Sequence, residues 1–226
     1  MADRKVLACS VLAEGQERMD ALEQVKEFYH LGRLPRHSPV EIPNTGREQL
    51  AELFAFLDFH CGAEIGVYQG EYSEILCKAN PNIHLLAVDS WINYDDFALR
   101  GMGQAKAQAQ ARLVGYNVDY FHMDSTEAAK RIMDDSLDFV YIDGNHDFLH
   151  VAQDLFYWTR KVRQGGIVAG HDYFQLKKPE SNMHVPPVLH AFTDIYKIHP
   201  WFILGTKAIV PGEIRERHRS WFWVRQ

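Results

Sequence analysis

Hydrophobic positions along the chain alternate between two patterns. Short apolar runs bounded by polar or turn residues indicate buried strands. Between them, apolar side chains recur every three or four residues, which indicates amphipathic helices. The predicted strands lie at residues 62–67, 84–89, 118–124, 137–143 and 167–172, and the predicted helices between them at 72–79, 104–114, 126–133 and 148–162.

This alternation predicts βαβ units, in which right-handed crossovers place helices over both faces of a parallel sheet. The end of the chain departs from the pattern. A helix at 186–199 is followed by strands at 201–210 and 221–225 with no helix between them. We therefore expect an α/β fold with a Rossmann-like, doubly wound, mostly parallel sheet and an antiparallel terminal strand pair.

The first 44 residues lie outside this alternation. Helical spacing of apolar residues predicts a helix over 14–31, and three prolines make 33–44 an extended connector. Thr45 is predicted to cap a helix that runs to Asp58. We divide the chain into an N-terminal segment, 1–44, that serves as a lid or dimer contact, and a main domain, 45–226.

Composition narrows the class of protein. A hydrophobic content of 46% with 24% charged residues is ordinary for a globular chain. The net charge of −6 argues against general nucleic-acid binding, and no apolar run approaches the roughly 20 residues that cross a bilayer. Three cysteines without metal-ligand spacing suit a reducing cytoplasm. We expect a cytoplasmic protein with a small-molecule partner, no nucleic-acid or membrane partner, and any homo-oligomer formed through the N-terminal segment.

Four of the predicted strands end in an aspartate, namely Asp89, Asp124, Asp143 and Asp172. A single aspartate at such a position could simply cap the following helix. Because the carboxyl ends of parallel strands share one edge of a sheet, four in succession indicate a binding site at that edge.

The first strand runs into a glycine-flanked turn, CGAEIGVYQGEYS, from Cys61 to Ser73. Gly66 and Gly70 would expose backbone N–H groups and a helix N-terminus, which suits a cofactor that carries a nucleotide or a carboxylate. Asp89 follows at nearly the interval at which an acid meets the ribose of a dinucleotide, so a nicotinamide cofactor stays open. The turn lacks the G-x-G-x-x-G pattern of such sites.

Taken together, the motifs resemble class I S-adenosylmethionine-dependent methyltransferases, most closely the small-molecule O-methyltransferases that modify sugars and antibiotics. The resemblance covers about residues 48–175 and rests on EIGVYQG at 64–70 with Tyr72-Ser73, Asp89, IDGNH at 142–146, Gly165-Gly166 and GHDY at 170–173. It implies S-adenosylmethionine as cofactor and a seven-stranded sheet whose last strand is antiparallel. Tyr68 stands where many family members have a second glycine.

The resemblance also implies roles for the matching residues. The turn would hold the methionine part of the cofactor, Asp89 the ribose, and Asp124 with Ser125 the adenine. Asp143 would lie near the sulfonium and the amino group. Ionised carboxylates only accept hydrogen bonds, which matches hydroxyl and ammonium donors. The implied cofactor-binding residues are Glu64, Gly66, Val67, Tyr68, Gly70, Ser73, Asp89, Ser90, Trp91, Asp124, Ser125, Asp143 and Gly144.

Methyl transfer to a hydroxyl group needs alignment of the reactants and removal of a proton. His146 and His171 are the candidate bases, since the ordinary pKa of histidine is near 6.5 and each lies beside a strand-end aspartate. With Asp143 and Asp172 they form the predicted catalytic group. Alternatively, Asp143, His171 and Asp172 hold Mg²⁺, which would lower the pKa of the acceptor hydroxyl. The base, the metal and the acceptor stay open.

Two other functions compete with this interpretation. Gly144–Asp147 and Asp58-Phe59-His60 mimic parts of a metallophosphoesterase site, although the other metal-binding motifs of that family are missing. A two-metal site needs the full ligand set. A catalytically inert, cofactor-binding protein on the same fold is the second alternative, because a fold does not fix a function.

Overall fold

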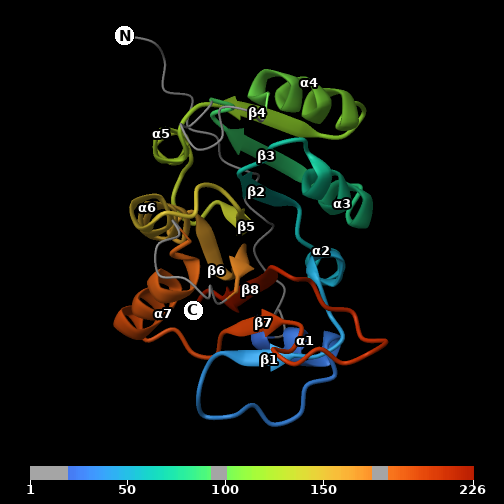
Figure 1. The fold of residues 1–226 in the computed structure, drawn as a ribbon, viewed down its shortest axis with the longest axis vertical. Coiled ribbons are helices and arrows are strands. Elements are labelled where there is room, and N and C mark those ends of the chain that lie inside the picture. Colours follow the sequence, from blue (N-terminus) through green and yellow to red (C-terminus); the bar gives the residue numbers. More distant parts are fainter. Residues whose placement is uncertain (1–19, 93–100, 175–182) are drawn as a thin grey trace, which may run out of the picture.

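The protein is described by a computed structural model that covers residues 20–92, 101–174 and 183–226 (Figure 1). Its helices are α1 (Ala21–Phe28), α2 (Arg47–Phe56), α3 (Glu71–Ala79), α4 (Met102–Arg112), α5 (Ser125–Ala129), α6 (Phe148–Trp158) and α7 (Val185–Tyr196). Its strands are β1 (Val40–Ile42), β2 (Cys61–Ile65), β3 (His84–Asp89), β4 (Val118–His122), β5 (Leu137–Ile142), β6 (Val162–Tyr173), β7 (Phe202–Leu204) and β8 (Arg219–Val224).

The strands form one sheet in the order β1-β7-β8-β6-β5-β2-β3-β4. β8 runs antiparallel to both of its neighbours, β6 and β7, and every other pairing is parallel. The chain winds outward from β2 in two directions, first to β3 and β4 and then back to β5 and β6. The switch between these directions falls between β2 and β5, where open α/β sheets bind their ligands.

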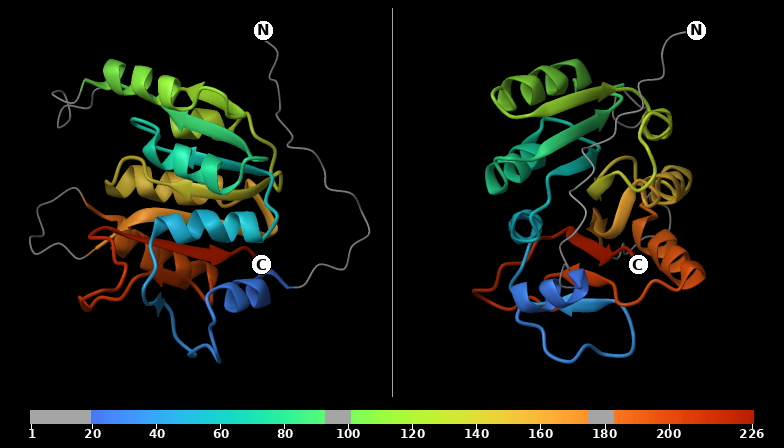
Figure 2. Two further views of the ribbon diagram at one scale, coloured as in Figure 1. Left: turned by 90° about the vertical axis from the view of Figure 1, so that its right-hand side faces the viewer. Right: turned by 180° about the vertical axis from the view of Figure 1, so that it is seen from behind.

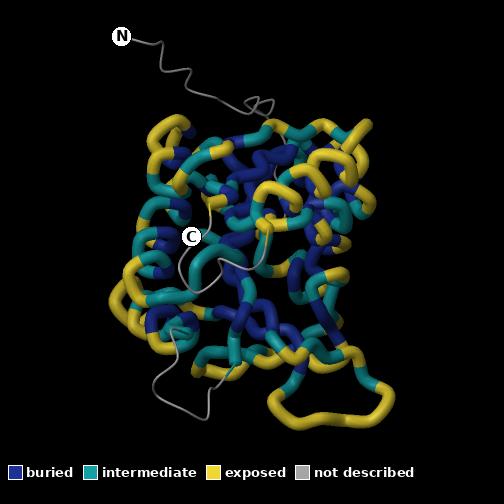
Figure 3. The backbone as a smooth tube through the Cα atoms, turned by 45° about the horizontal axis from the view of Figure 1, so that its top comes forward, coloured by how far each residue is buried: buried dark blue, intermediate teal, exposed yellow. Residues whose placement is uncertain are grey.

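Helices cover both faces of the sheet. Helices α5, α6 and α7 lie on one face and α1 to α4 on the other (Figures 1 and 2). Each face of the sheet has its own hydrophobic core, and alternate residues of β5 contribute to each. Val140 and Ile142 pack on the face covered by α5, α6 and α7, and Phe139 and Tyr141 pack on the opposite face. Buried residues follow the strands through the interior while exposed residues follow the outer helices and loops (Figure 3).

The predicted doubly wound sheet is confirmed, but it has eight strands rather than seven. The additional strand is β1, which lies in the connector predicted to be extended. Its residues pair in parallel with β7, Val40 opposite Phe202 and Ile42 opposite Leu204. Pro39 and Pro43 flank this short edge strand, so its local sequence predicts a connector. Its pairing with β7 makes it a strand.

The predicted antiparallel terminal pair is also confirmed, but β7 is much shorter than the strand predicted over 201–210, and β8 begins two residues before the predicted 221. The helix predicted over 148–162 is shorter in the structure, since α6 ends at Trp158, and the strand predicted over 167–172 begins earlier, because β6 already includes residues 162–166. Gly165 has a φ of +73°, and the pairing of β6 with β5 is irregular just before Phe139.

The N-terminal predictions need smaller corrections. Residues 14–19 of the first predicted helix lie outside the described residues, and α1 covers only 21–28. Gly46 rather than Thr45 precedes α2, and its N–H donates to Gln49 Oε1 at 2.9 Å. The Thr45 hydroxyl donates to the Ile42 carbonyl at 2.7 Å, which joins β1 to this turn. The use of residues 1–44 as a lid or dimer contact stays a prediction.

Candidate active site

A cavity of about 810 Å³ opens at the carboxyl edge of the sheet, beside the switch between β2 and β5. Eleven of the residues predicted to form the site line it: Glu64, Gly66, Val67, Tyr68, Asp89, Ser90, Asp124, Ser125, Asp143, Gly144 and His146. The other five, Gly70, Ser73, Trp91, His171 and Asp172, do not line it. Three of the four strand-end aspartates, Asp89, Asp124 and Asp143, therefore meet the glycine turn at one edge, as their order in the sequence predicts.

Gly66 is required by a close contact between two strand ends. Its φ is +92°, and a Cβ at this position would lie 2.1 Å from the Asp143 carbonyl oxygen. No side chain fits there without moving the backbone that carries Asp143. Gly70, with a φ of +74°, forms the N-cap of α3. The two glycines thus let the turn approach β5 and start the helix.

Asp89 holds the loop at Tyr68, where the sequence departs from the family pattern. Asp89 Oδ2 accepts the Tyr68 N–H at 2.8 Å, and Asp89 Oδ1 accepts the Trp91 N–H at 2.7 Å. Trp91 Nε1 donates in turn to the Tyr68 carbonyl at 2.8 Å. These bonds stabilise the φ of +50° at Tyr68, which is unusual for a residue other than glycine.

Glu64 lies under the floor of the cavity with only 1% of its surface exposed. Burial raises its pKa to about 8, although the Ser73 hydroxyl donates to its Oε2 and opposes that shift. Ser73 therefore reaches the site through Glu64 rather than by lining the cavity.

At the other end of the cavity, Asp124 caps α5. Its Oδ1 accepts the Thr126 N–H at 2.8 Å. The next residue, Ser125, donates to Asp154 Oδ1 at 2.5 Å. Asp154 comes from α6 and is 3% exposed, and burial raises its pKa to about 7. No motif in the sequence indicates Asp154, since an acid inside a helix is usually a surface residue.

Two acids and two histidines form a cluster beside the cavity. His146 Nε2 lies 2.7 Å from Asp172 Oδ2 and 3.8 Å from Asp143 Oδ1. His171 Nδ1 lies 3.7 Å from an oxygen of each acid. Burial works against the charged imidazoles, but the two nearby carboxylates of Asp143 and Asp172 outweigh it and raise the pKa of His146 to about 9 and of His171 to about 10. With these pKa values both rings are protonated at neutral pH.

Asp143, His146 and Asp172 can place one ligand atom each within 4.8 Å of one another. His146 Nε2 is buried and, despite its short distance to Asp172, makes no aligned hydrogen bond. This set fits a divalent cation, with carboxylates that suit Mg²⁺ and an imidazole that transition metals prefer. The histidine of the set is His146 rather than the predicted His171.

Three residues from outside the motifs also reach the site. His218 Nδ1 lies 2.5 Å from Asp172 Oδ1, and its ring lies 4.2 Å from that of Phe174. Glu216, on the same loop before β8, pairs with Arg47 at the start of α2, where Oε1 and Nε are 3.3 Å apart. These residues are far from the strand ends in sequence, so no spacing pattern could have indicated them.

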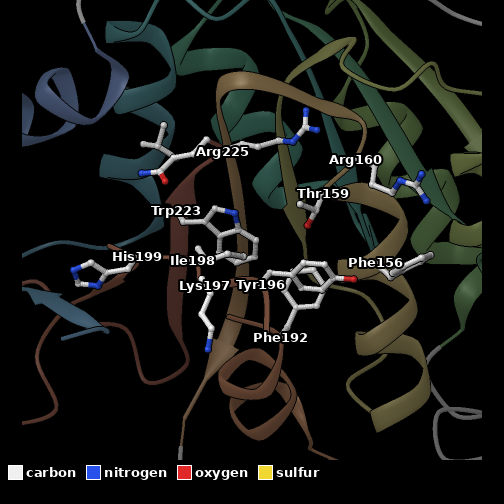
Figure 4. Close-up of a pocket in the computed structure, with 12 residues that line it drawn as sticks. Phe156, Thr159, Arg160, Phe192, Tyr196, Lys197, Ile198, His199, Trp223 and Arg225 are labelled. Atoms are coloured by element: carbon white, nitrogen blue, oxygen red, sulfur yellow. The ribbon is translucent and has the colours of Figure 1, made fainter. Parts of the chain in front are cut away.

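A second, smaller cavity of about 380 Å³ lies at the opposite edge of the sheet. It is formed by the last residues of α6, α7 and β8, and Figure 4 shows the rings of Phe192, Tyr196 and Trp223 gathered at its centre. None of the predicted site residues lines it.

The geometry also separates the two halves of the metallophosphoesterase signature. Asp58 and His60 immediately precede β2, at the amino end of a strand parallel to β5. Asp143 and His146 follow the carboxyl end of β5. The two pairs therefore lie at opposite edges of the sheet, and the hydrolase alternative is not supported.

Comparison with known proteins agrees with this arrangement. A family described as a methyltransferase domain matches residues 63–173. No curated protein matches the sequence. No helix among the described residues is both long and apolar enough to cross a membrane.

Among solved structures, the chain is similar to the O-methyltransferase TomG from Streptomyces achromogenes, involved in tomaymycin synthesis and solved with S-adenosylmethionine. The identity is 16%, 93% of this chain and 92% of TomG are covered, and the TM-score is 0.55. It is also similar to an O-methyltransferase from Bacillus cereus solved with S-adenosylhomocysteine, at 14% identity, 92% coverage of both chains and a TM-score of 0.57. Residues 63–173 therefore match a methyltransferase-domain family, and the chain has the same fold as these solved O-methyltransferases.

Proposed function

We propose that this protein is an S-adenosylmethionine-dependent O-methyltransferase that methylates a hydroxyl group of a small molecule in the cytoplasm. The observation that carries the proposal is the convergence of the glycine turn, Asp89, Asp124 and Asp143 on one cavity within the methyltransferase domain. The similar structures from Streptomyces achromogenes and Bacillus cereus support O-methylation and the cofactor.

The cavity suggests how the cofactor lies. Its methionine part lies between the β2–α3 turn and the end of β5, close to Gly66 and Asp143. The ribose hydroxyls donate to Asp89, whose carboxylate already shapes the Tyr68 loop. The adenine lies toward Asp124 and Ser125. The sulfonium end of the bound cofactor would then lie nearest to Asp143 and His146, the two members of the acid–histidine cluster that line the cavity.

In the reaction, the acceptor oxygen attacks the methyl carbon in line with the sulfur. The C–O bond forms as the C–S bond breaks, and S-adenosylhomocysteine leaves as a neutral thioether. The hydroxyl proton passes to the carboxylate of Asp143, which lines the cavity, while the protonated rings of His146 and His171 stabilise the developing negative charge. The chain contributes chiefly alignment of the two reactants and stabilisation of the developing oxyanion.

A divalent cation would be held by Asp143, His146 and Asp172, the described residues that place their ligand atoms together. When bound, such an ion lowers the pKa of the acceptor hydroxyl. A metal requirement is tested by removing divalent ions with a chelator and restoring Mg²⁺ or Mn²⁺ during the assay.

The test is a methyl-transfer assay with a panel of phenols, catechols and sugars. The His171→Ala variant should bind S-adenosylhomocysteine within about twofold of wild type while turnover falls by about 100-fold, the lower range for loss of a group that stabilises a developing oxyanion. His37→Ala, at an exposed position far from the cavity, is the control. Unchanged turnover would remove His171 from the mechanism, and cofactor binding without transfer to any acceptor would favour the inert-protein alternative.

A further inference from the structure

The cofactor cavity contains an excess of negative charge. Its lining includes seven carboxyl groups. Burial raises the pKa of Glu64 to about 8 and of Asp154 to about 7, which leaves these two partly uncharged at neutral pH. The negative charge comes chiefly from Glu71, Asp89, Asp124, Asp143 and Asp147. These acids suit the amino group and hydroxyls of S-adenosylmethionine, but they repel the α-carboxylate of its methionine part. Among the described residues of the lining, Arg47 is the only arginine, and there is no lysine.

Arg47 is held in place by two residues, Glu216 and Tyr72. Its Nε lies 3.3 Å from Glu216 Oε1, and its backbone N–H donates to Glu216 Oε2 at 3.2 Å. Its Cζ lies 5.4 Å from the centre of the Tyr72 ring, and the Tyr72 hydroxyl donates to its carbonyl at 3.0 Å. A guanidinium group fixed in this way loses little conformational freedom when it binds a ligand.

The ends of the guanidinium are available for a ligand. Within the described part of the chain, neither Nη atom donates a hydrogen bond, while 28% of the side chain is exposed. Arg47 lines the cavity together with Glu64 and Tyr72, at the end away from Asp124 and Ser125. This is the end that the methionine part of the cofactor occupies in the proposed pose.

We propose that Arg47 binds the α-carboxylate of S-adenosylmethionine through its free Nη atoms. The assignment rests on the proposed function and adds a cofactor-binding residue from outside the methyltransferase domain. Glu216 is the positioning residue, so the start of α2 and the loop before β8 both contribute to cofactor affinity.

The test compares two ligands that differ only in this carboxylate, S-adenosylhomocysteine and its decarboxylated analogue. Dissociation constants are measured by calorimetry for wild type, Arg47→Gln and Arg47→Lys. Arg47→Gln should weaken S-adenosylhomocysteine by about 10- to 100-fold, as expected for a hydrogen bond between charged groups. The analogue should change by less than about threefold, because it lacks the group that Arg47 contacts. Arg47→Lys keeps the positive charge but lacks the planar guanidinium. Its affinity for S-adenosylhomocysteine should therefore fall between those of wild type and Arg47→Gln.

Arg131→Gln, an exposed arginine in the connection after α5, is the matched control and should leave both affinities unchanged. An equal loss for the two ligands would show that Arg47 only supports the cavity and would overturn the assignment. The assignment would also be overturned if Arg47→Gln kept the cofactor affinity of wild type and instead raised the KM for the acceptor. Failure of wild type to bind S-adenosylhomocysteine would instead contradict the proposed function itself.

Discussion

At the scale of single residues, the site depends on backbone contacts as much as on side chains. The acids at the strand ends could be predicted because each lies next to a strand with a clear apolar pattern. His218 and Arg47 could not, since they reach the site only after β8 and α2 have packed. The protonation of His146 and His171 also needed the structure, because each ring lies near one acid that is close in sequence and a second acid that is distant in sequence.

Gly66→Ala should disrupt the site severely. The added methyl group would lie 2.1 Å from the Asp143 carbonyl oxygen, so the turn or the end of β5 must move. We expect a loss of several kcal/mol of stability and at least a tenfold loss of S-adenosylhomocysteine affinity.

Gly115→Ala is the control, because Gly115 has a nearly equal φ of +90° and no atom within 4 Å of the added Cβ. It should cost only about 1–2 kcal/mol of backbone strain and leave cofactor affinity unchanged. Equal effects of the two substitutions on affinity, measured by calorimetry after chemical denaturation has established their stabilities, would contradict the contact argument.

Asp154 should make the stability of the ligand-free protein depend on pH. Burial raises its folded-state pKa to about 7, while the unfolded chain has a value near 3.8. Between these pH values the folded state holds more protons, so the free energy of unfolding falls as pH rises. The expected loss from this residue is on the order of 2–4 kcal/mol, complete above about pH 7.

Asp154→Asn cannot ionise and should gain stability relative to wild type as the pH is raised from 4 to 8. Urea denaturation across this range measures the difference. A constant difference between the two proteins at every pH would show that Asp154 is not perturbed.

At the scale of elements, the long helices and central strands follow their apolar periodicity, and their order could be predicted. The exceptions are short or irregular. β1 has three residues between two prolines. β6 contains Gly165 and Gly166, and its run of buried apolar residues begins only after them, at Ile167. In both places the pairing with a neighbouring strand, rather than local propensity, decides the structure.

The cap of α6 gives a prediction at this scale. Asp147 Oδ1 accepts the His150 N–H at 3.0 Å and fixes the start of the helix, directly after the loop that carries Gly144 and His146. Asp147→Ala should cost about 1 kcal/mol of stability and weaken cofactor binding, because that loop loses its anchor.

Asp20→Ala removes the corresponding cap of α1, where Asp20 Oδ1 accepts the Leu22 N–H at 3.0 Å. It should cost a similar amount of stability without changing cofactor affinity. If thermal denaturation and calorimetry gave the same pattern for both variants, the α6 cap would have no special role in the site.

At the scale of the whole molecule, one sheet edge gathers residues from along most of the chain. The central strands supply the glycine turn and the acids, and the segments on either side supply Arg47, Glu216 and His218. The sequence predicted the first group because βαβ order determines which strand ends meet. The second group depends on how β1, β7 and β8 complete the sheet, which no local pattern encodes.

The central claim is that the cavity binds S-adenosylmethionine. Calorimetry with S-adenosylhomocysteine and with NAD(H) tests it most directly, using wild type and Asp89→Ala. We predict one S-adenosylhomocysteine site per chain, at least tenfold weaker in Asp89→Ala because both carboxylate contacts that shape the Tyr68 loop are lost, and no NAD(H) binding. Tight binding of NAD(H) with no response to S-adenosylhomocysteine would contradict the account.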